Sequence, residues 1–493
     1  MDLWDLTNFV LVAIVLFLFF QLVCSKGSKT SVPPGPTPLP ILGNMLQLDS
    51  KNFLTSLDKL AEKYGPVYTI YLGLQRVIIL HGYEAVKEAL IDQGDKFIYR
   101  KSLPIFEEVF KEYGILSSNG ERWKQIRRFS LMTMKNFGMG KRTIEERVQE
   151  EAQCLVKELQ NTKAQALDPT FILSCAPCNV ICSILFNHRF NYDDEKFLHL
   201  MKMLNENFRL LNTPWIKLYN VYPSLIKHFP GSHRTIHKNI IEIRGFIMNQ
   251  VKEHEEILDP NNPQDYIDCF LIRMQQEKMN PESDFSYQEL LSTASNLFAA
   301  GTETTATTLR YGLLLLMKYP EIQAKVHEEI DRVVGSSRRP SMQDRIKMPY
   351  VEAVVHEIQR YISLLPFSIP RTTTQDIHFR NHVIPKDTIV FPVLHSILYD
   401  KKVFPNPYQF DPENFLTKSG DFQKNDHFTP FSLGKRNCLG ESLARMEVFL
   451  FLTTILQNFT LKPLVDPKEV NITPLMSGLL NLPPIYKLSL LPR

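Results

Sequence analysis

The stretch Phe431-Ser432-Leu433-Gly434-Lys435-Arg436-Asn437-Cys438-Leu439-Gly440 indicates the fold class of this chain. Cys438 stands between two glycines and beside a basic pair, directly ahead of a helix-like run from 441 to 446. Helix N-terminal N–H groups and nearby positive charge would stabilise a thiolate at this position. The glycines let the backbone approach a flat, bulky group, because no Cβ stands in the way. A lone cysteine is more often structural, but the whole pattern favours a thiolate ligand.

The pattern Phe-x-x-Gly-x-Arg-x-Cys-x-Gly resembles the haem-binding loop of the cytochrome P450 monooxygenases. The resemblance makes Cys438 the axial ligand of the iron, a thiolate that promotes O–O cleavage. It implies haem b as cofactor, O2 as co-substrate, and contacts to the haem from Phe431, Arg436 and Gly440. The implied fold is mainly α with a small β region.

Composition narrows the class of protein. With 493 residues, of which 44% are hydrophobic and 22% charged, the chain can bury a large core. No zinc-finger, Walker or basic-zipper pattern occurs, and the net charge is only +3, so nothing supports nucleic-acid binding. Seven cysteines, an odd number, favour a reducing compartment over a disulfide framework. Cys175-Ala-Pro-Cys178 could be a redox or zinc motif, but its apolar surroundings favour core packing.

The N-terminus predicts a membrane anchor. Residues 9 to 23 are nearly all apolar, and extension back to Leu3 gives about the twenty residues that a membrane span needs. Acidic residues precede this run and lysines follow it, which places the rest of the chain in the cytosol. We expect an anchor over 1–25, a basic and proline-rich hinge over 26–45 that acts as a spacer, and one catalytic domain over 46–493. By resemblance, the protein is a single-pass protein of the endoplasmic reticulum membrane.

The body of the chain is mostly helical by pattern. Runs typical of helices lie at 149–158, 194–211, 238–254 and 287–318. Residues 67–72 and 76–80 predict a β-hairpin, and a second strand-rich region runs from 369 to 393. Residues 404–431 predict a long irregular segment ahead of the cysteine loop.

A helix with a small, polar face is predicted around 296–309. Asn296, Ala300 and Thr304 recur every four residues within an apolar run. Ala300-Gly301 leaves room for a small molecule, while Glu303 and Thr304 could organise water. Taken alone, the motif fits an exposed acid and a back-bonded threonine. Together with Cys438, it resembles the oxygen-activation motif of the P450 enzymes, in which Ala300 lies at the haem, Thr304 holds water near bound oxygen, and Glu303 helps to relay protons.

Glu357 and Arg360 match the buried Glu–Arg pair that braces the haem-side core of the P450 family. An exposed pair at this spacing is common and contributes only ~0.3 kcal/mol. The third member of the family's brace is usually an arginine, but this chain has Asn414 there, which can hydrogen-bond but carries no charge.

The haem propionates require basic or hydrogen-bonding partners. Trp123 and Arg127 match the family's Trp-x-x-x-Arg and lie one helical turn apart. By position, Arg100, Arg371 and Arg436 resemble the remaining partners.

Seven basic residues face one acid between 121 and 142. Such a run is usually a solvated helix face. Because no Rossmann fingerprint or P-loop is present, electrons from NADPH must arrive through another protein. In the family this is NADPH–cytochrome P450 reductase, sometimes cytochrome b5, and we expect it to dock on Arg122, Lys124, Arg128, Lys135, Lys141 and Lys435.

Analogy suggests a substrate pocket, although each candidate fits a core position equally well. The candidates are Phe106, Phe110, Leu116, Ser117, Asn205, Phe208, Asn296, Phe298, Ala299, Leu364, Leu365, Ile369 and Leu479. No cationic anchor stands among them.

The resemblance is closest to vertebrate microsomal family 2, with features of its subfamilies C and E. It implies hydroxylation or epoxidation of fatty acids, steroids, retinoids or xenobiotics. A haem-thiolate peroxide isomerase and a non-catalytic haem sensor or carrier of apolar ligands remain as alternatives.

Overall fold

The computed structural model describes residues 32–49, 52–136, 142–476 and 478–493. Contacts divide the chain into two compact units. Unit 1 contains the described residues up to Tyr99 together with Ile369–Val393, and unit 2 contains Arg100–Ser368 and Leu394–Arg493. The predicted anchor and the first part of the hinge lie outside the described residues. Within the described ranges, no helix has the length and apolar character needed to cross a membrane.

Unit 1 is built on a four-stranded sheet with the order β1-β2-β6-β3. The predicted hairpin is confirmed: β1 pairs antiparallel with β2, with Val67 opposite Leu80. β2 pairs parallel with β6, with Val77 opposite Ile389, so the sheet joins segments about 300 residues apart. The elements are η2 (Met45–Gln47), α2 (Phe53–Tyr64), β1 (Val67–Leu72), β2 (Gln75–His81), α3 (Tyr83–Lys87), η3 (Glu88–Asp92), β3 (Arg371–Thr372), β4 (Ile377–Phe379), β5 (His382–Ile384) and β6 (Ile389–Val393).

The proline-rich segment is not a free spacer along its whole length. Thr69 on β1 donates its backbone N–H to the carbonyl of Pro34 at 2.8 Å and its hydroxyl to that of Pro33 at 2.6 Å. A Cβ on Gly35 would lie 1.9 Å from the Thr69 carbonyl oxygen, so only glycine permits this approach. From Pro33 onward, the expected hinge is therefore part of unit 1.

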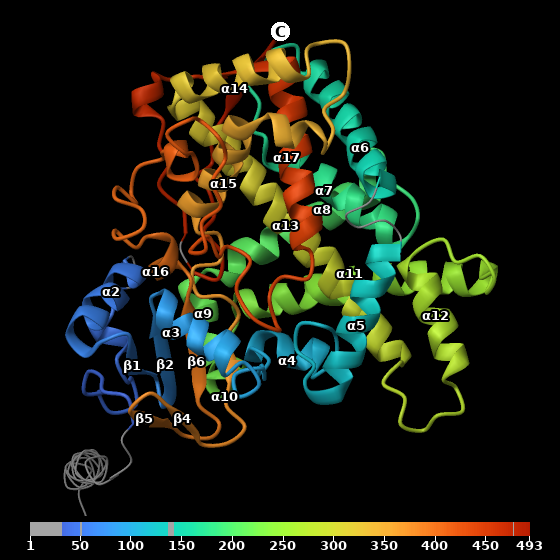
Figure 1. The fold of residues 1–493 in the computed structure, drawn as a ribbon. Helices are drawn as coiled ribbons and strands as arrows, with labels where there is room; N and C mark the ends of the chain where they lie inside the picture. Colours follow the sequence, from blue (N-terminus) through green and yellow to red (C-terminus); the bar gives the residue numbers. More distant parts are fainter. Residues whose placement is uncertain (1–31, 50–51, 137–141, 477) are drawn as a thin grey trace, which may run out of the picture. The chain divides into compact units, whose positions relative to one another are not determined.

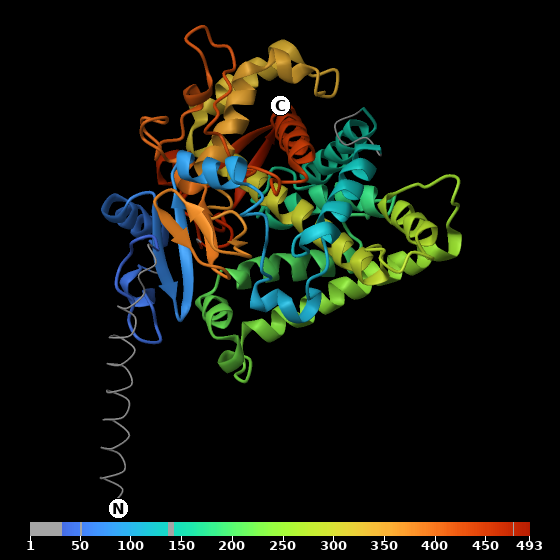
Figure 2. The ribbon, with the colours of Figure 1, turned by 60° about the horizontal axis from the view of Figure 1, so that its bottom comes forward.

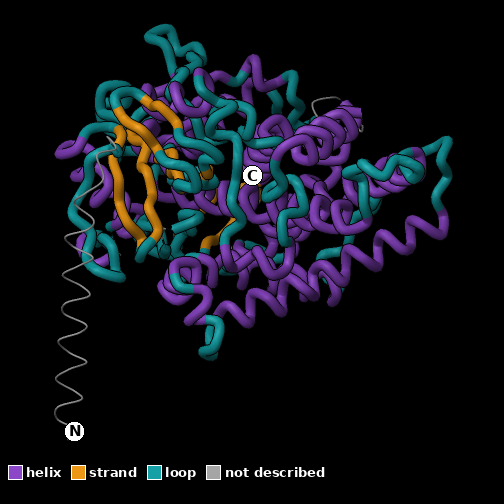
Figure 3. Tube along the Cα trace, turned by 90° about the horizontal axis from the view of Figure 1, so that it is seen from below, coloured by secondary structure: helices purple, strands orange, loops and turns teal. Residues whose placement is uncertain are grey.

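Unit 2 is mainly helical. Figure 3, which draws helices in purple and strands in orange, shows that only a small part of the described chain is strand. Its helices are α4 (Pro104–Phe110), α5 (Gly120–Asn136), α6 (Arg142–Asn161), α7 (Thr170–Leu185), α8 (Glu195–Leu211), α9 (Pro214–Val221), α10 (Pro223–Ile226), α11 (Ser232–Ile257), α12 (Tyr266–Gln276), α13 (Tyr287–Lys318), α14 (Pro320–Val333), η4 (Asp344–Lys347), α15 (Pro349–Ile362), α16 (His395–Leu398), η5 (Pro412–Phe415), α17 (Glu441–Asn458) and η6 (Pro467–Glu469). β7 (Phe459–Pro463) pairs antiparallel with β8 (Leu488–Pro492).

The long helix α13 runs through unit 2 beside α7 and α17 (Figure 1). Its bounds match the prediction for residues 287–318. The side chain of Ser286 accepts the backbone N–H of Glu289 and caps the helix. Nearly every residue from 302 to 317 is buried, because neighbouring helices cover all sides of this half.

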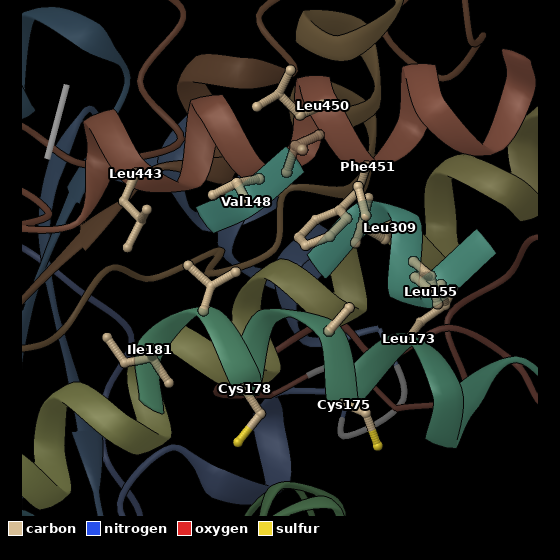
Figure 4. Packing of buried hydrophobic residues seen from close by; sticks show 14 of the residues in the cluster. Val148, Leu155, Leu173, Cys175, Cys178, Ile181, Leu309, Leu443, Leu450 and Phe451 are labelled. Carbon is tan, nitrogen blue, oxygen red and sulfur yellow. The ribbon is translucent and has the colours of Figure 1, made fainter. Parts of the chain in front are cut away.

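The core of unit 2 forms where α6, α7, α13 and α17 meet (Figure 4). Cys175 and Cys178 lie in this core on α7, 1% and 0% exposed, which confirms the prediction of core packing. Burial raises the pKa of both thiols, so neither is a reactive thiolate.

A second hydrophobic cluster joins α4 to α9, α10 and α11. Ile105 on α4 belongs to this cluster, and its backbone is also held by two side chains. The backbone N–H of Ile105 donates to the Asn220 side chain at 3.2 Å, and the Ile105 carbonyl oxygen lies 2.9 Å from His237 Nε2. Figure 2 shows α4 beside the long helix α11. These contacts fix α4, and with it the loop 111–119, against the N-terminal half of α11.

Candidate active site

The cysteine loop ends at α17, as predicted, with Glu441 as the first helical residue. Cys438 donates its backbone N–H to the Phe431 carbonyl at 2.9 Å, which closes the loop. A Cβ on Gly440 would meet no atom within 4 Å, so the space beside it is open. Cys438 is exposed, yet its thiol is desolvated by the protein around it. Cys438 therefore keeps surface open to a ligand, although protein groups surround its thiol.

Neighbouring groups shift the pKa of the Cys438 thiol in opposite directions. Burial raises the pKa of its thiol, and Glu441 raises it further. A hydrogen bond from the backbone N–H of Gly440 and the charges of Arg127 and Arg100 lower it. The helix terminus and the basic side chains thus favour a thiolate, as the sequence indicated, and oppose the cost of burial.

Four of the five predicted propionate partners gather at this loop. The guanidinium carbon of Arg436 lies 3.9 Å from the ring centroid of Trp123. Arg127 donates to the backbone carbonyl of Asn437 at 2.9 Å and to its side-chain oxygen at 2.7 Å. Arg100 donates to the carbonyl of Arg436 at 3.2 Å. The indole Nε1 of Trp123 is buried and has no hydrogen-bond partner among the described residues. The fifth, Arg371, lies on β3 in unit 1, where it is buried.

The middle of helix α13 is buried except on one face. Ala300 is exposed, and Gly301 and Thr304 are half-buried, whereas Phe298 and Thr302 are fully buried. The Thr304 hydroxyl donates to the Ala300 carbonyl at 2.7 Å, which leaves its oxygen lone pairs free to accept. On this face, packed side chains therefore do not cover α13.

Among the described residues, Glu303 makes no hydrogen bond to Thr304. One oxygen accepts the Thr307 hydroxyl at 3.0 Å and lies 3.6 Å from Arg310, and the other, Oε2, has no partner in the described part of the chain. Burial raises the pKa of this carboxyl, while Arg310 and Thr307 lower it. Next to Thr304, Thr305 donates to Glu447 on α17 at 3.1 Å.

The Glu357–Arg360 pair on α15 is fully buried and bidentate, with both N–O distances at 2.7 Å. Arg360 also donates to three backbone carbonyls, from Leu398, Pro407 and Gln409. Asn414 donates to Glu357 at 3.3 Å. The asparagine therefore takes part in the brace through a neutral hydrogen bond.

The predicted pocket residues fall into separate groups. Phe106, Phe110, Leu116, Ala299, Leu364, Leu365 and Leu479 are half-buried, and Ile369 belongs to unit 1. Phe298 is different: its ring packs against Phe186 and Phe246 in the core, which disfavours a pocket role.

The polar residues of the predicted pocket form hydrogen bonds with the protein itself. Asn296 accepts the Leu116 N–H at 3.1 Å, Ser117 is buried and its carbonyl accepts from Asn119, and Asn205 donates to the Met201 carbonyl. Phe208 is half-buried on α8.

The expected docking residues lie mainly on α5. Lys124, Arg128 and Lys135 are exposed, as is Lys435 in the cysteine loop. Arg122 is half-buried and forms an ion pair with Asp284 at 3.2 Å. Lys141 lies outside the described residues.

The family model for cytochrome P450 matches residues 33–490. The chain belongs to the cytochrome P450 family. It is similar to cytochrome P450 2C44 of Mus musculus, 60% identical over 494 residues, with 100% of each chain covered. Cytochrome P450 2C23 of Rattus norvegicus is 59% identical, also over 100% of each chain, and cytochrome P450 2C8 of Homo sapiens is 57% identical over 98% of this chain and 99% of the relative.

This cytochrome P450 is a haem-thiolate monooxygenase that acts on apolar small molecules with O2 and with electrons delivered through a reductase. The residues present fit the haem. The buried, unpartnered Nε1 of Trp123 and the adjacent guanidinium groups match an anionic edge, and the exposed Ala300 and Cys438 border open space. The family resemblance, the P450 fold and the monooxygenase class predicted from the sequence are confirmed.

Two site residues of the P450 were not foreseen. Asn119 accepts from Arg436 at 3.0 Å and donates to the Arg100 carbonyl at 2.7 Å, so it ties two of the arginines together. Asn437 holds Arg127. The sequence alone predicts only a helix start at Asn119-Gly120 and a turn at Asn437. It does not predict their hydrogen bonds, because the arginine partners lie far away along the chain.

Proposed function

We propose that Cys438 is the axial ligand and that Arg100, Trp123, Arg127 and Arg436 hold the propionates. For Arg371, the sequence resemblance alone supports a role as a fifth partner. The observation that carries this proposal is the gathering of three guanidinium groups and the unpartnered Trp123 Nε1 around one exposed cysteine. Cations and N–H donors in this arrangement suit the carboxylates of a haem.

Bound haem would supply O2 activation and the transfer of one oxygen atom to the substrate. The Gly440 N–H and the charge of Arg127 favour the thiolate form of Cys438. Thr304 offers its lone pairs to a water, and the Glu303 carboxyl, whose pKa is raised by burial, lies one residue away. We propose that these two residues move protons to the site.

The axial role is tested with Cys438→Ser, against Cys269→Ser on α12 as a control for a half-buried cysteine. The wild-type and Cys269→Ser proteins should give the red-shifted CO spectrum of a thiolate-ligated haem after reduction, and Cys438→Ser should not. A thiolate-type spectrum in Cys438→Ser would overturn the assignment.

The proton role is tested with Thr304→Ala. Loss of the hydroxyl should reduce product formation about tenfold while NADPH oxidation continues, since proton transfer by a positioned group contributes at least this much. Thr302→Ala is the control, because Thr302 makes the same hydrogen bond to a carbonyl four residues earlier but is buried. Equal losses in both variants would point to helix stability instead.

We propose that Phe106, Phe110, Leu116, Ala299, Leu364, Leu365 and Leu479 line the substrate pocket, because they are apolar and not fully buried in the core. The reductase, and cytochrome b5 as an alternative donor, would dock on the exposed cations of α5 and on Lys435, which suit an acidic partner.

The apolar residues 1–25 would anchor the chain once in the endoplasmic reticulum membrane, with both units in the cytosol. Deletion of residues 1–25 should shift the protein from the membrane pellet toward the high-salt wash, with an unchanged CO spectrum. Retention of the deleted form after the wash would show that other surfaces suffice for binding.

A further inference from the structure

Arg445 on α17 contacts residues at both ends of the cysteine loop. Its guanidinium carbon lies 4.9 Å from the ring centroid of Phe431, the first residue of that loop. Its Nε and Nη2 donate to Oε1 of Glu441, the first residue after the loop, at 3.1 and 3.0 Å. Because the Phe431 carbonyl also accepts the backbone N–H of Cys438, a single cation is connected to the start and the end of the segment that carries the cysteine.

A histidine accepts a hydrogen bond from the remaining edge of this guanidinium. Nη1 of Arg445 lies 3.1 Å from Nε2 of His356 on α15, and the arginine must be the donor because it has no acceptor atom. The other ring nitrogen, Nδ1, lies 2.8 Å from the Glu352 carbonyl oxygen and donates to it. Burial lowers the pKa of His356 to about 4, and the charge of Arg445 contributes to the same shift. The imidazole is therefore neutral near pH 7 and orients Arg445 without adding a second positive charge.

The carboxylate that Arg445 holds acts on the cysteine. Glu441 lies three residues after Cys438, and its negative charge raises the pKa of the thiol and so opposes the thiolate. The exposed fraction is 21% for the Arg445 side chain and 34% for that of Glu441, so water screens this ion pair less than a fully exposed pair. A cation at hydrogen-bond distance offsets the field of the carboxylate at its neighbours.

We propose that Arg445 is a positioning residue that offsets the charge of Glu441 beside Cys438 and thereby sets the one-electron reduction potential of the haem held by this cysteine. The inference rests on the proposed axial role of Cys438. When the ferric iron takes one electron from the reductase, the site gains one negative charge. Glu441 without its counter-charge would oppose that gain, so loss of Arg445 makes reduction harder and loss of the Glu441 charge makes it easier.

The test measures the reduction potential of the full-length, haem-loaded protein by titration with redox mediators. The variants are Arg445→Met, Glu441→Gln and the two combined, together with Arg445→Lys, which keeps a cation. Arg273→Met on α12 is the matched control. Arg273 also forms an ion pair with an acid four residues later, Glu277, and also lies over an aromatic ring, that of Phe285.

Arg445→Met should lower the equilibrium constant for reduction about threefold, a modest effect because the pair is partly exposed. Glu441→Gln should raise that constant by a similar factor, and the combined variant should return close to the wild type. Arg445→Lys should stay near the wild-type value, and Arg273→Met should not shift it. All variants should keep the thiolate-type CO spectrum, because each retains Cys438.

Three outcomes would overturn the proposal. An unchanged potential in Arg445→Met would show that its charge does not reach the site. The same shift in Arg445→Met and in the combined variant would show that Glu441 is not the charge it offsets. Loss of the thiolate-type spectrum in both would show that Arg445 only maintains the shape of the loop. Failure of the axial assignment would look different, because the wild-type protein itself would then lack that spectrum.

Discussion

At the residue scale, buried carboxyl groups differ in which neighbouring group offsets the cost of burying them. Glu357 has Arg360, and Glu303 has Arg310, but Glu447 on α17 has only the Thr305 hydroxyl. Burial raises the pKa of Glu447 to about 8, partly offset by the hydrogen bond from Thr305. A neutral carboxylic acid in the native protein follows from the missing counter-charge.

Glu447 should therefore make stability fall as pH rises. Because its pKa is higher in the folded than in the unfolded chain, the native state holds more protons between about pH 4.5 and pH 8, and the free energy of unfolding falls with pH across this window. Glu447→Gln should flatten that dependence and raise the unfolding midpoint at pH 8. Thermal unfolding monitored by circular dichroism at pH 5 and pH 8 measures both effects. The exposed control Glu469→Gln should follow the wild type, and a matching profile in Glu447→Gln would contradict the prediction.

The brace gives a second prediction at this scale. Arg360→Ala leaves Glu357 as a buried charge without its cation, which costs about 3–5 kcal/mol. Asn414→Ala removes one neutral hydrogen bond, which costs about 1 kcal/mol. Urea unfolding of the two variants should rank them in this order. A larger effect of Asn414→Ala would mean that the asparagine, and not the arginine, carries the brace.

At the scale of elements, the loop 111–119 depends on its contacts with α13. Glu289 accepts the Gly114 N–H at 2.9 Å, and Asn296 accepts the Leu116 N–H. From the other side, Arg436 donates to the Ser118 carbonyl at 2.6 Å. The loop thus links the cysteine loop to α13 near its exposed face at Ala300, so its conformation should affect ligand binding.

Gly114→Ala should disturb this loop for two reasons. Gly114 has φ of +85°, and a Cβ there would lie 2.5 Å from Asn296 Oδ1 and 3.1 Å from the backbone of Ser292. Gly65→Ala is the matched control, because Gly65 has φ of +89° but no atom within 4 Å of an added Cβ. Both variants should lose about 1 kcal/mol from backbone strain, and Gly114→Ala should lose more and bind ligands less tightly. Calorimetry and spectral titration measure the two effects, and equal losses in the pair would exclude the clash.

At the scale of the whole molecule, the charges on α5 act through solvent rather than through contacts inside the fold. Arg122 is half-buried in its ion pair with Asp284, whereas Lys124, which pairs with Glu121 on the same helix at 2.6 Å, is exposed, as are Arg128 and Lys135. Exposed charges of this kind steer an encounter and contribute little to stability.

Replacement of Lys124, Arg128 and Lys135 by glutamine should raise the KM for the reductase several-fold at low salt. The difference should shrink at high salt, where the Debye length falls to about 3 Å at 1 M. Steady-state turnover at varied reductase and salt concentrations measures this. The control replaces Lys196, Lys202 and Lys238, which are exposed on α8 and α11. Equal effects of the two triple variants would indicate net charge rather than a docking face.

Local patterns in the sequence determined the cysteine loop and the start of α17, the span of α13, the β1–β2 hairpin and the family. Each of these rests on residues close together along the chain, whose spacing sets backbone geometry directly. The sequence also pointed to the residue types that a haem requires.

Only the tertiary structure decided which distant residues meet. Arg127 finds Asn437 across 310 positions, Asn119 finds Arg436 across 317, and β2 pairs with β6. Periodicity fixes which face of a helix is apolar, but packing decides which charges lose their water.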